Sequence, residues 1–275
     1  MPINFDVVID TPDPSLDMKA GLETFQGISD ATRLIAETIL KEHVPQRLSY
    51  RGKVRTNLKK SFKGSYGQIF DLEFYDQGLQ DKFDRIGKPA FLQLMQYFLN
   101  ESLYEDQDSN ELSPKAHKVL EKLGDVADHL VKKLRMSSLE QIHQVSVKFG
   151  YDTRLRFRKS SENQILIAKF DTETVKAIEA TEDQEIVDLT VSITRLNIHT
   201  GNGRFVEKGK YETVAFGFAA EYRLIRLAAK KLFSENLDHN NGLDQEQWKT
   251  LIVSARAIKL RDGKVIKYIV TSFRQ

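Results

Sequence analysis

The sequence contains no cysteine. Disulfide bonds, thiolate nucleophiles and cysteine-ligated zinc or iron–sulfur centres are therefore excluded. It also has no run of about 18 apolar residues, so we expect no transmembrane helix. The first residues lack the basic and apolar regions of a secretory signal, and we expect a cytoplasmic protein that does not associate with a membrane.

Recognisable catalytic signatures are also missing. The six histidines show no metal-ligand spacing, and no HExxH, G-x-S-x-G, P-loop or Gly-rich dinucleotide-binding pattern occurs. Residues 238–246 are spaced like a calcium loop, but their glycine stands at the fifth position instead of the sixth. We therefore predict no catalytic residue, no metal site and no cofactor, and we favour a role other than that of an enzyme.

One acidic pair leaves an enzymatic alternative open. Asp71 and Glu73 fall on one face of an expected strand, near Lys53 and Lys59, and two carboxylates can hold a magnesium ion. No D…[DE]-x-K pattern accompanies them, so solvated strand charges are the simpler interpretation. A metal-dependent nuclease is the alternative that this pair supports.

Length and charge give the broad class. With 275 residues, 40% hydrophobic and 29% charged, the chain resembles one or two globular domains. The net charge is only +2, yet residues 51–75 carry +4, residues 113–170 carry +6 and residues 191–275 carry +7, with acidic segments between them. Segregated charge of this kind indicates basic faces that can meet a nucleic acid or an acidic partner.

The N-terminal part mixes strand and helix patterns. We therefore predict an α+β domain over residues 1–150, in which helices pack on a small antiparallel sheet. A break in its long first helix is expected near Gly27. The expected strands are 4–10, 48–58 and 69–75, and the expected helices are 16–44, 91–104 and 113–135.

Two expected strands carry three cations at alternate positions, so that the charges share one face of the strand. Such a face can follow a row of phosphates. The connection after the first of these strands adds lysines interleaved with aromatic residues. We predict phosphate binding along Arg51, Lys53 and Arg55, with Lys60 and Lys63 of the connection, or along Arg154, Arg156 and Arg158.

Residues 187–206 open a C-terminal module with a strand, a turn and a second strand. Apolar residues alternate from Val187 to Ile193, a slip at Arg195 predicts a β-bulge, and Gly201 and Gly203 allow the turn. A short strand, a helix and a hairpin around Asp-Gly are expected at 213–218, 221–233 and 248–273. We predict an OB-like β-barrel with one helix over residues 151–275, or from about residue 180 if the hairpin 151–170 belongs to the first domain.

The spacing of Asn197, Gly201, Gly203, Phe205 and Val206, followed by a short apolar strand, resembles the first half of a cold-shock domain, which is an OB-fold. The resemblance covers about 90 C-terminal residues, and it implies that aromatics of the second and third strands stack the bases of single-stranded RNA or DNA. The usual stacking positions hold Asn202 and Arg204 here. The predicted contacts to bases or to a partner are Asn202, Arg204, Phe205, Phe216, Lys259 and Lys264.

These patterns favour a non-catalytic nucleic-acid-binding or adaptor protein. The main alternative is a protein–protein interaction module, such as a homo-oligomer building block or an assembly subunit of a bacterial multi-protein system, including a defence system. It would use the same surface without a steep dependence of binding on salt.

Overall fold

The structure is a computed structural model, and it describes residues 2–62, 66–105 and 112–274. It contains two compact units, which meet in the sequence between Ile178 and Glu179 instead of at residue 150. We refer to them as unit 1 and unit 2. Among the described residues, no helix has the length and apolar character needed to cross a membrane.

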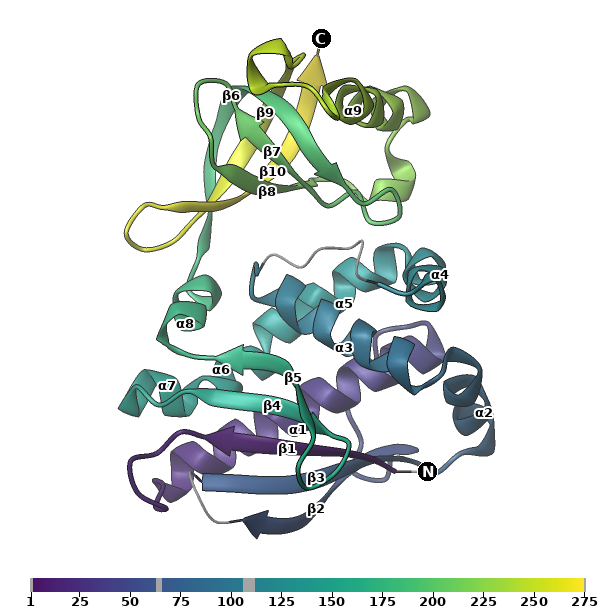
Figure 1. The fold of residues 1–275 in the computed structure, drawn as a ribbon, viewed down its shortest axis with the longest axis vertical. Coiled ribbons are helices and arrows are strands. Elements are labelled where there is room, and N and C mark those ends of the chain that lie inside the picture. The colour runs from purple at the N-terminus through teal and green to yellow at the C-terminus, as the bar shows by residue number, and fades with distance from the viewer. Residues whose placement is uncertain (1, 63–65, 106–111, 275) are drawn as a thin grey trace. The chain divides into compact units, whose positions relative to one another are not determined.

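Unit 1 is built on an antiparallel five-stranded sheet in the order β2-β3-β1-β4-β5. β1 lies in the centre, between β3 and β4 (Figure 1), because most of its residues are apolar and all but Asn4 are buried. β4 pairs with β1, and this pairing is the reason that the hairpin 151–170 belongs to unit 1. The strands are β1 (Ile3–Ile9), β2 (Val54–Phe62), β3 (Tyr66–Phe74), β4 (Thr153–Arg158) and β5 (Gln164–Phe170).

Helices supply the rest of the unit 1 core, which joins them to the apolar face of the sheet. The first of them, α1, is capped at its N-terminus by Asp17, whose carboxylate accepts a hydrogen bond from the N–H of Ala20 at 2.9 Å. The helices are α1 (Met18–Lys41), α2 (Gln77–Ile86), α3 (Lys88–Ser102), α4 (Pro114–Leu123), α5 (Asp125–Met136), α6 (Ser138–Ile142), α7 (Gln144–Phe149) and α8 (Thr172–Ile178).

Two glycines explain where the expected helices differ from the observed ones. Gly27 does not break α1. A Cβ at this position would lie 2.6 Å from the backbone N of Ile142, so the glycine lets α6 pack closely against α1. Gly124 has a φ of +50° and separates α4 from α5, so the expected helix 113–135 is two helices.

Unit 2 has five strands whose pairing runs β10-β8-β7-β6-β9 and returns from β9 to β10 (Figure 1). β8 and β10 are parallel, and the other pairs are antiparallel. The predicted bulge is present in β6, where the register with β7 shifts between Ile193 and Arg195. The elements are β6 (Thr181–Leu196), β7 (Gly203–Glu207), β8 (Thr213–Phe218), the 3-10 turn η2 (Tyr222–Leu224), α9 (Leu227–Asn240), the 3-10 turn η3 (Gln245–Gln247), β9 (Leu251–Lys259) and β10 (Val265–Arg274).

Close packing accounts for both glycines of the turn between β6 and β7. Gly201 has a φ of +73°, and a Cβ there would lie 2.3 Å from the ring of Tyr222. A Cβ on Gly203 would lie 2.3 Å from the carbonyl oxygen of Arg195 and 2.7 Å from the ring of Phe216. The Gly-x-Gly spacing therefore serves the packing of unit 2.

Candidate nucleic-acid interface

The first predicted phosphate rail does not form an even row. β2 begins at Val54, so Arg51 and Lys53 precede the strand and do not share a strand face with Arg55. Lys53 is ion-paired with Asp76, and the guanidinium of Arg55 lies 4.6 Å from the centre of the Tyr75 ring. Of the connecting lysines, Lys60 is exposed on β2, and Lys63 lies outside the described residues.

The second predicted rail is a set of internal ion pairs. Arg154, Arg156 and Arg158 do share one face of β4, as their spacing predicted, but β1 brings acidic partners beside them. The guanidinium groups of Arg156 and Arg158 lie 2.6 Å and 2.9 Å from the two carboxylate oxygens of Asp6, whose side chain is fully buried. Arg154 is ion-paired with Asp10. The carboxylates of Asp6 in β1 and of Asp10 just after it therefore occupy the positions expected for phosphates.

The acidic pair of the nuclease alternative also lies within unit 1. The buried Asp71 is 2.6 Å from the ammonium of Lys59, and it accepts a hydrogen bond from Asn57 at 3.0 Å. The same amide donates to Glu73 at 3.1 Å. Across the described residues, no group of three or more His, Asp or Glu side chains is arranged to hold a metal ion.

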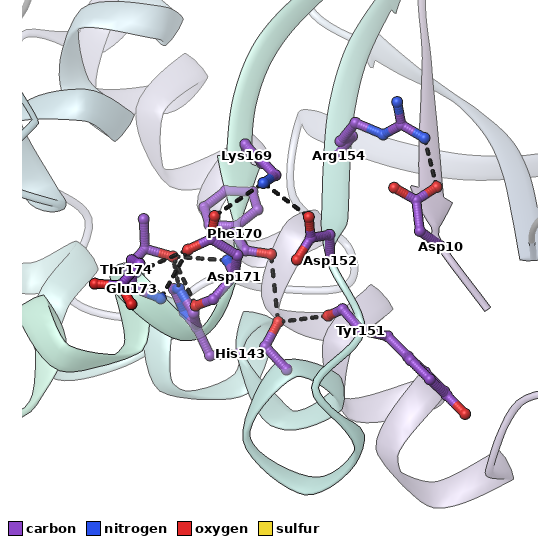
Figure 2. Close-up of polar contacts among 11 residues, drawn as sticks. Asp10, His143, Tyr151, Asp152, Arg154, Lys169, Phe170, Asp171, Glu173 and Thr174 are labelled. Atoms are coloured by element: carbon purple, nitrogen blue, oxygen red, sulfur yellow. Dashed lines mark hydrogen bonds and ion pairs between the residues drawn. The ribbon is translucent and has the colours of Figure 1, made fainter. Parts of the chain in front are cut away.

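Figure 2 shows a further polar cluster in unit 1, which holds α8 in place. The imidazole Nδ1 of His143 donates to the carbonyl of Leu139 at 2.7 Å, and its Nε2 lies 2.8 Å from the hydroxyl oxygen of Thr174. Lys169 reaches Asp152 and Asp171 at 2.7 Å and 3.0 Å, and the hydrogen bond to Asp152 does most to raise the pKa of Lys169. Burial lowers the pKa of His143, because the charged ring would lose its hydration. The contact between His143 and Thr174 ties α8 to the junction of α6 and α7.

In unit 2, the two predicted stacking aromatics cannot serve that purpose. The side chains of Phe205 and Phe216 are fully buried, and their rings stack on each other with centroids 5.4 Å apart. Phe216 also packs against Phe233 of α9 at 5.6 Å. Both belong to the core of unit 2, and because alternate strand residues face opposite sides, the residues before them, Arg204 and Ala215, face the other side of the sheet.

Arg204 and Ala215 belong to a row of paired residues on this outer side that also includes Arg195 and Lys267. The strand registers pair Arg195 of β6 with Arg204 of β7, Arg204 with Ala215 of β8, and Ala215 with Lys267 of β10. Residues paired in this way lie on the same face of a sheet. We call Arg195, Arg204 and Lys267, with Ala215 between the last two, the outer cationic face.

Local contacts fix the side chains of this face. Arg204 donates from its Nε to the hydroxyl of Thr213 at 2.8 Å and from a terminal nitrogen to the carbonyl of the same residue at 2.7 Å. Lys267 donates to the amide oxygen of Asn202 at 3.0 Å. Gly217 makes room for this contact, because a Cβ there would lie 2.8 Å from that same oxygen. The outer cationic face thus brings its three cations and the predicted residue Asn202 together beside the small residues Ala215 and Gly217.

The remaining predicted residues lie at the end of β9 and in the turn after it, and one further aromatic residue lies in a loop. Lys259 is ion-paired with Asp183 at 2.7 Å, and the hydrogen bond between them raises the pKa of Lys259. Lys264 is exposed at the turn between β9 and β10. Sequence reasoning missed Tyr211, which is 89% exposed in the loop between β7 and β8. The neighbouring lysines Lys208 and Lys210 were the available signal, because aromatic residues between cations are typical of single-strand binding.

Comparisons with known proteins identify no relative of this chain. No family model matches the chain, and neither a curated protein nor a solved structure is significantly similar to it.

Proposed function

We propose that unit 2 is an OB-like module that binds single-stranded RNA or DNA without catalysis. Its strand order supports the assignment, because its five strands pair in a ring and α9 lies between the third and fourth of them. In OB-folds, oligonucleotides bind on the second and third strands and on the loops between strands 1 and 2 and between strands 4 and 5. The corresponding elements here are β7 and β8 with the segments 197–202 and 260–264.

The outer cationic face is the observation that carries the proposal. Arg195 and Arg204 are paired across β6 and β7, and Lys267 is two strands further along the same row. A phosphate backbone crossing the strands would meet these cations in turn. Ala215 and Gly217 leave the surface between them low, so that bases can lie against β8. We assign the stacking of a base to Tyr211 and to the guanidinium plane of Arg204.

Fluorescence anisotropy with labelled oligonucleotides tests this function. Single-stranded DNA, single-stranded RNA and duplex DNA are titrated with the full chain over a salt series, with and without magnesium. We expect the single strands to bind more tightly than the duplex and the affinity to fall steeply with salt. Absence of binding at low salt would remove the proposal, and cleavage of the strand with magnesium would replace it by the nuclease alternative.

A pair of double variants locates the site. Arg204→Ala with Lys267→Ala removes two charges from the outer cationic face, and Arg226→Ala with Lys231→Ala removes two from α9 and the residue before it. The first should weaken binding at least about tenfold, and the second should have a much smaller effect. Equal losses would mean that only net charge matters.

A further inference from the structure

A second surface of unit 2 lies where η2 leads into α9. Sequence periodicity places Leu224 and Leu227 on the buried stripe of a helix over 221–233, yet each of them is 68% exposed. Four cations lie in the same stretch of chain. We call the two leucines and these cations the α9 corner: Arg223, Leu224, Arg226, Leu227, Lys230 and Lys231.

The packing of this segment shows why the leucines face outward. Tyr222 is the buried residue that anchors the corner, with its ring 5.6 Å from Phe218 and in close contact with Gly201. α9 begins only at Leu227, so its inward side starts with Ala229 and Phe233. The core of unit 2 is complete without Leu224 and Leu227, and their apolar character has no role in it.

The α9 corner also has more positive charge than its surroundings balance. Glu221 pairs with Arg223 at 2.8 Å, and the ammonium of Lys230 lies 4.5 Å from the centre of the Tyr222 ring. The side chains of Arg226 and Lys231 make no hydrogen bond or ion pair with any other residue that the structure describes. The α9 corner therefore combines exposed apolar side chains with cations that lack an acidic partner among the described residues.

We propose that the α9 corner docks a protein partner, through a segment in which apolar side chains are flanked by Asp or Glu. The leucines give such a segment apolar contact area, and the cations select for its negative charge and set its orientation. The role is separate from nucleic-acid binding on the outer cationic face, and it would make the protein an adaptor between the two ligands.

Two other ligands with negative charge fit the corner less well. A nucleic acid is the first of them. Its phosphates would make no favourable contact with two exposed leucines, and residues 223–231 include no aromatic ring on which a base could stack. An anionic lipid surface matches the charge, but the aromatic side chains that anchor proteins at membrane interfaces are absent from the same stretch. The combination of leucine and cation is instead complementary to an acidic, apolar peptide.

The test uses the full chain and a labelled synthetic peptide in which leucines alternate with pairs of glutamates. Two sister peptides replace either the glutamates by lysine or the leucines by serine. We expect saturable binding of the first peptide only, weakening as salt rises. Leu224→Ser with Leu227→Ser, and separately Arg226→Glu with Lys231→Glu, should each weaken it at least about tenfold.

Matched controls separate docking from loss of fold and from nucleic-acid binding. Ile198→Ser removes another apolar side chain of unit 2 that is 64% exposed, and it should leave peptide binding unchanged. Arg204→Ala with Lys267→Ala should also leave it unchanged, so the two proposals can fail separately. All variants should keep the wild-type circular dichroism spectrum and thermal unfolding midpoint, since the substituted side chains of the corner lie at the surface.

Three results would overturn the proposal. One is no saturable binding of the glutamate–leucine peptide at millimolar concentration, and another is equal binding of the serine peptide. The third is that the leucine variant binds the peptide as well as wild type does, but has lost affinity for vesicles containing phosphatidylserine or for a single-stranded oligonucleotide. That result would assign the corner to a lipid surface or a nucleic acid instead.

Discussion

At the scale of single residues, Gly203 is a position that leaves no room for a larger side chain. Gly203 faces a backbone carbonyl of β6 on one side and the ring of Phe216 on the other. Neither neighbour is the flexible end of a side chain, because the carbonyl belongs to a paired strand and the ring is part of the core. The turn and the core of unit 2 therefore both depend on the absence of a Cβ at this position.

We predict that Gly203→Ala destabilises unit 2 by about 1–3 kcal/mol, because the added methyl group overpacks a fixed site. Chemical denaturation followed by circular dichroism measures the change. Gly209→Ala is the matched control for an exposed glycine: nothing lies within 4 Å of its added Cβ, although its positive φ of +85° carries a backbone cost. An unchanged midpoint for Gly203→Ala would show that β6 and β7 can separate at little cost.

The buried imidazole of His143 links the stability of unit 1 to pH. Burial lowers its pKa in the folded state, so the unfolded chain takes up the proton more readily. The stabilising contribution is complete above the unfolded-state pKa of about 6.5 and is lost as the pH falls below it.

His143→Gln should therefore reduce the loss of stability between pH 7 and pH 5, measured as the shift of the denaturation midpoint. The exposed His43→Gln is the control and should keep the wild-type pH dependence. An identical pH dependence for wild type and His143→Gln would contradict this role.

At the scale of elements, β4 shows what one partner strand does to an expected binding site. The alternation of Arg154, Arg156 and Arg158 is visible in the sequence, and so is their common face. The partner Asp6 is not, because β1 lies about 150 residues earlier in the chain and only sheet pairing brings it alongside. A strand pattern identifies the side of a sheet on which a charge lies, but the neighbouring strand decides what that charge binds.

Arg156→Leu with Arg158→Leu should destabilise unit 1 by about 2–4 kcal/mol, because the carboxylate of Asp6 would stay buried without a cation. Arg154→Leu on the same strand should cost less than about 1 kcal/mol, because its partner Asp10 is partly exposed. Denaturation curves of the two variants give the comparison, and similar values for both would contradict the burial argument.

In unit 2 as well, local sequence signals predicted some features correctly, whereas features that depend on contacts between distant residues could not be predicted. The apolar periodicity and the Asp-Gly turn located the strands of unit 2 from Val187 onward, because these signals are local. The first part of β6, from Thr181, was missed because it carries few apolar residues. The start of α9 at Leu227 was missed, because Ile225 and Arg226 have extended backbone angles, with ψ of 129° and 142°, between η2 and α9. The inward orientation of Phe205 and Phe216 needed the register of β7 and β8, which the bulge in β6 helps to set.

At the scale of the whole molecule, the chain is two units with separate cores. The apolar cluster of unit 1 contains residues up to Phe170, and the cluster of unit 2 begins at Leu189. A unit with a core of its own can fold alone. We expect fragments 1–178 and 179–275 to unfold cooperatively and their circular dichroism spectra to sum to that of the full chain. A fragment without a cooperative transition would show that its core depends on the other unit.

The most direct test of the central claim is the salt dependence of single-strand binding at the outer cationic face. For wild type and Lys267→Ala, the logarithm of the affinity is plotted against the logarithm of the salt concentration. If Lys267 contacts a phosphate, the slope should become shallower by about 0.7 in the variant, as expected for the loss of one such contact with a single strand. The exposed Lys231→Ala should leave the slope unchanged. Equal slopes for wild type and Lys267→Ala would contradict the assignment of this face to nucleic acid.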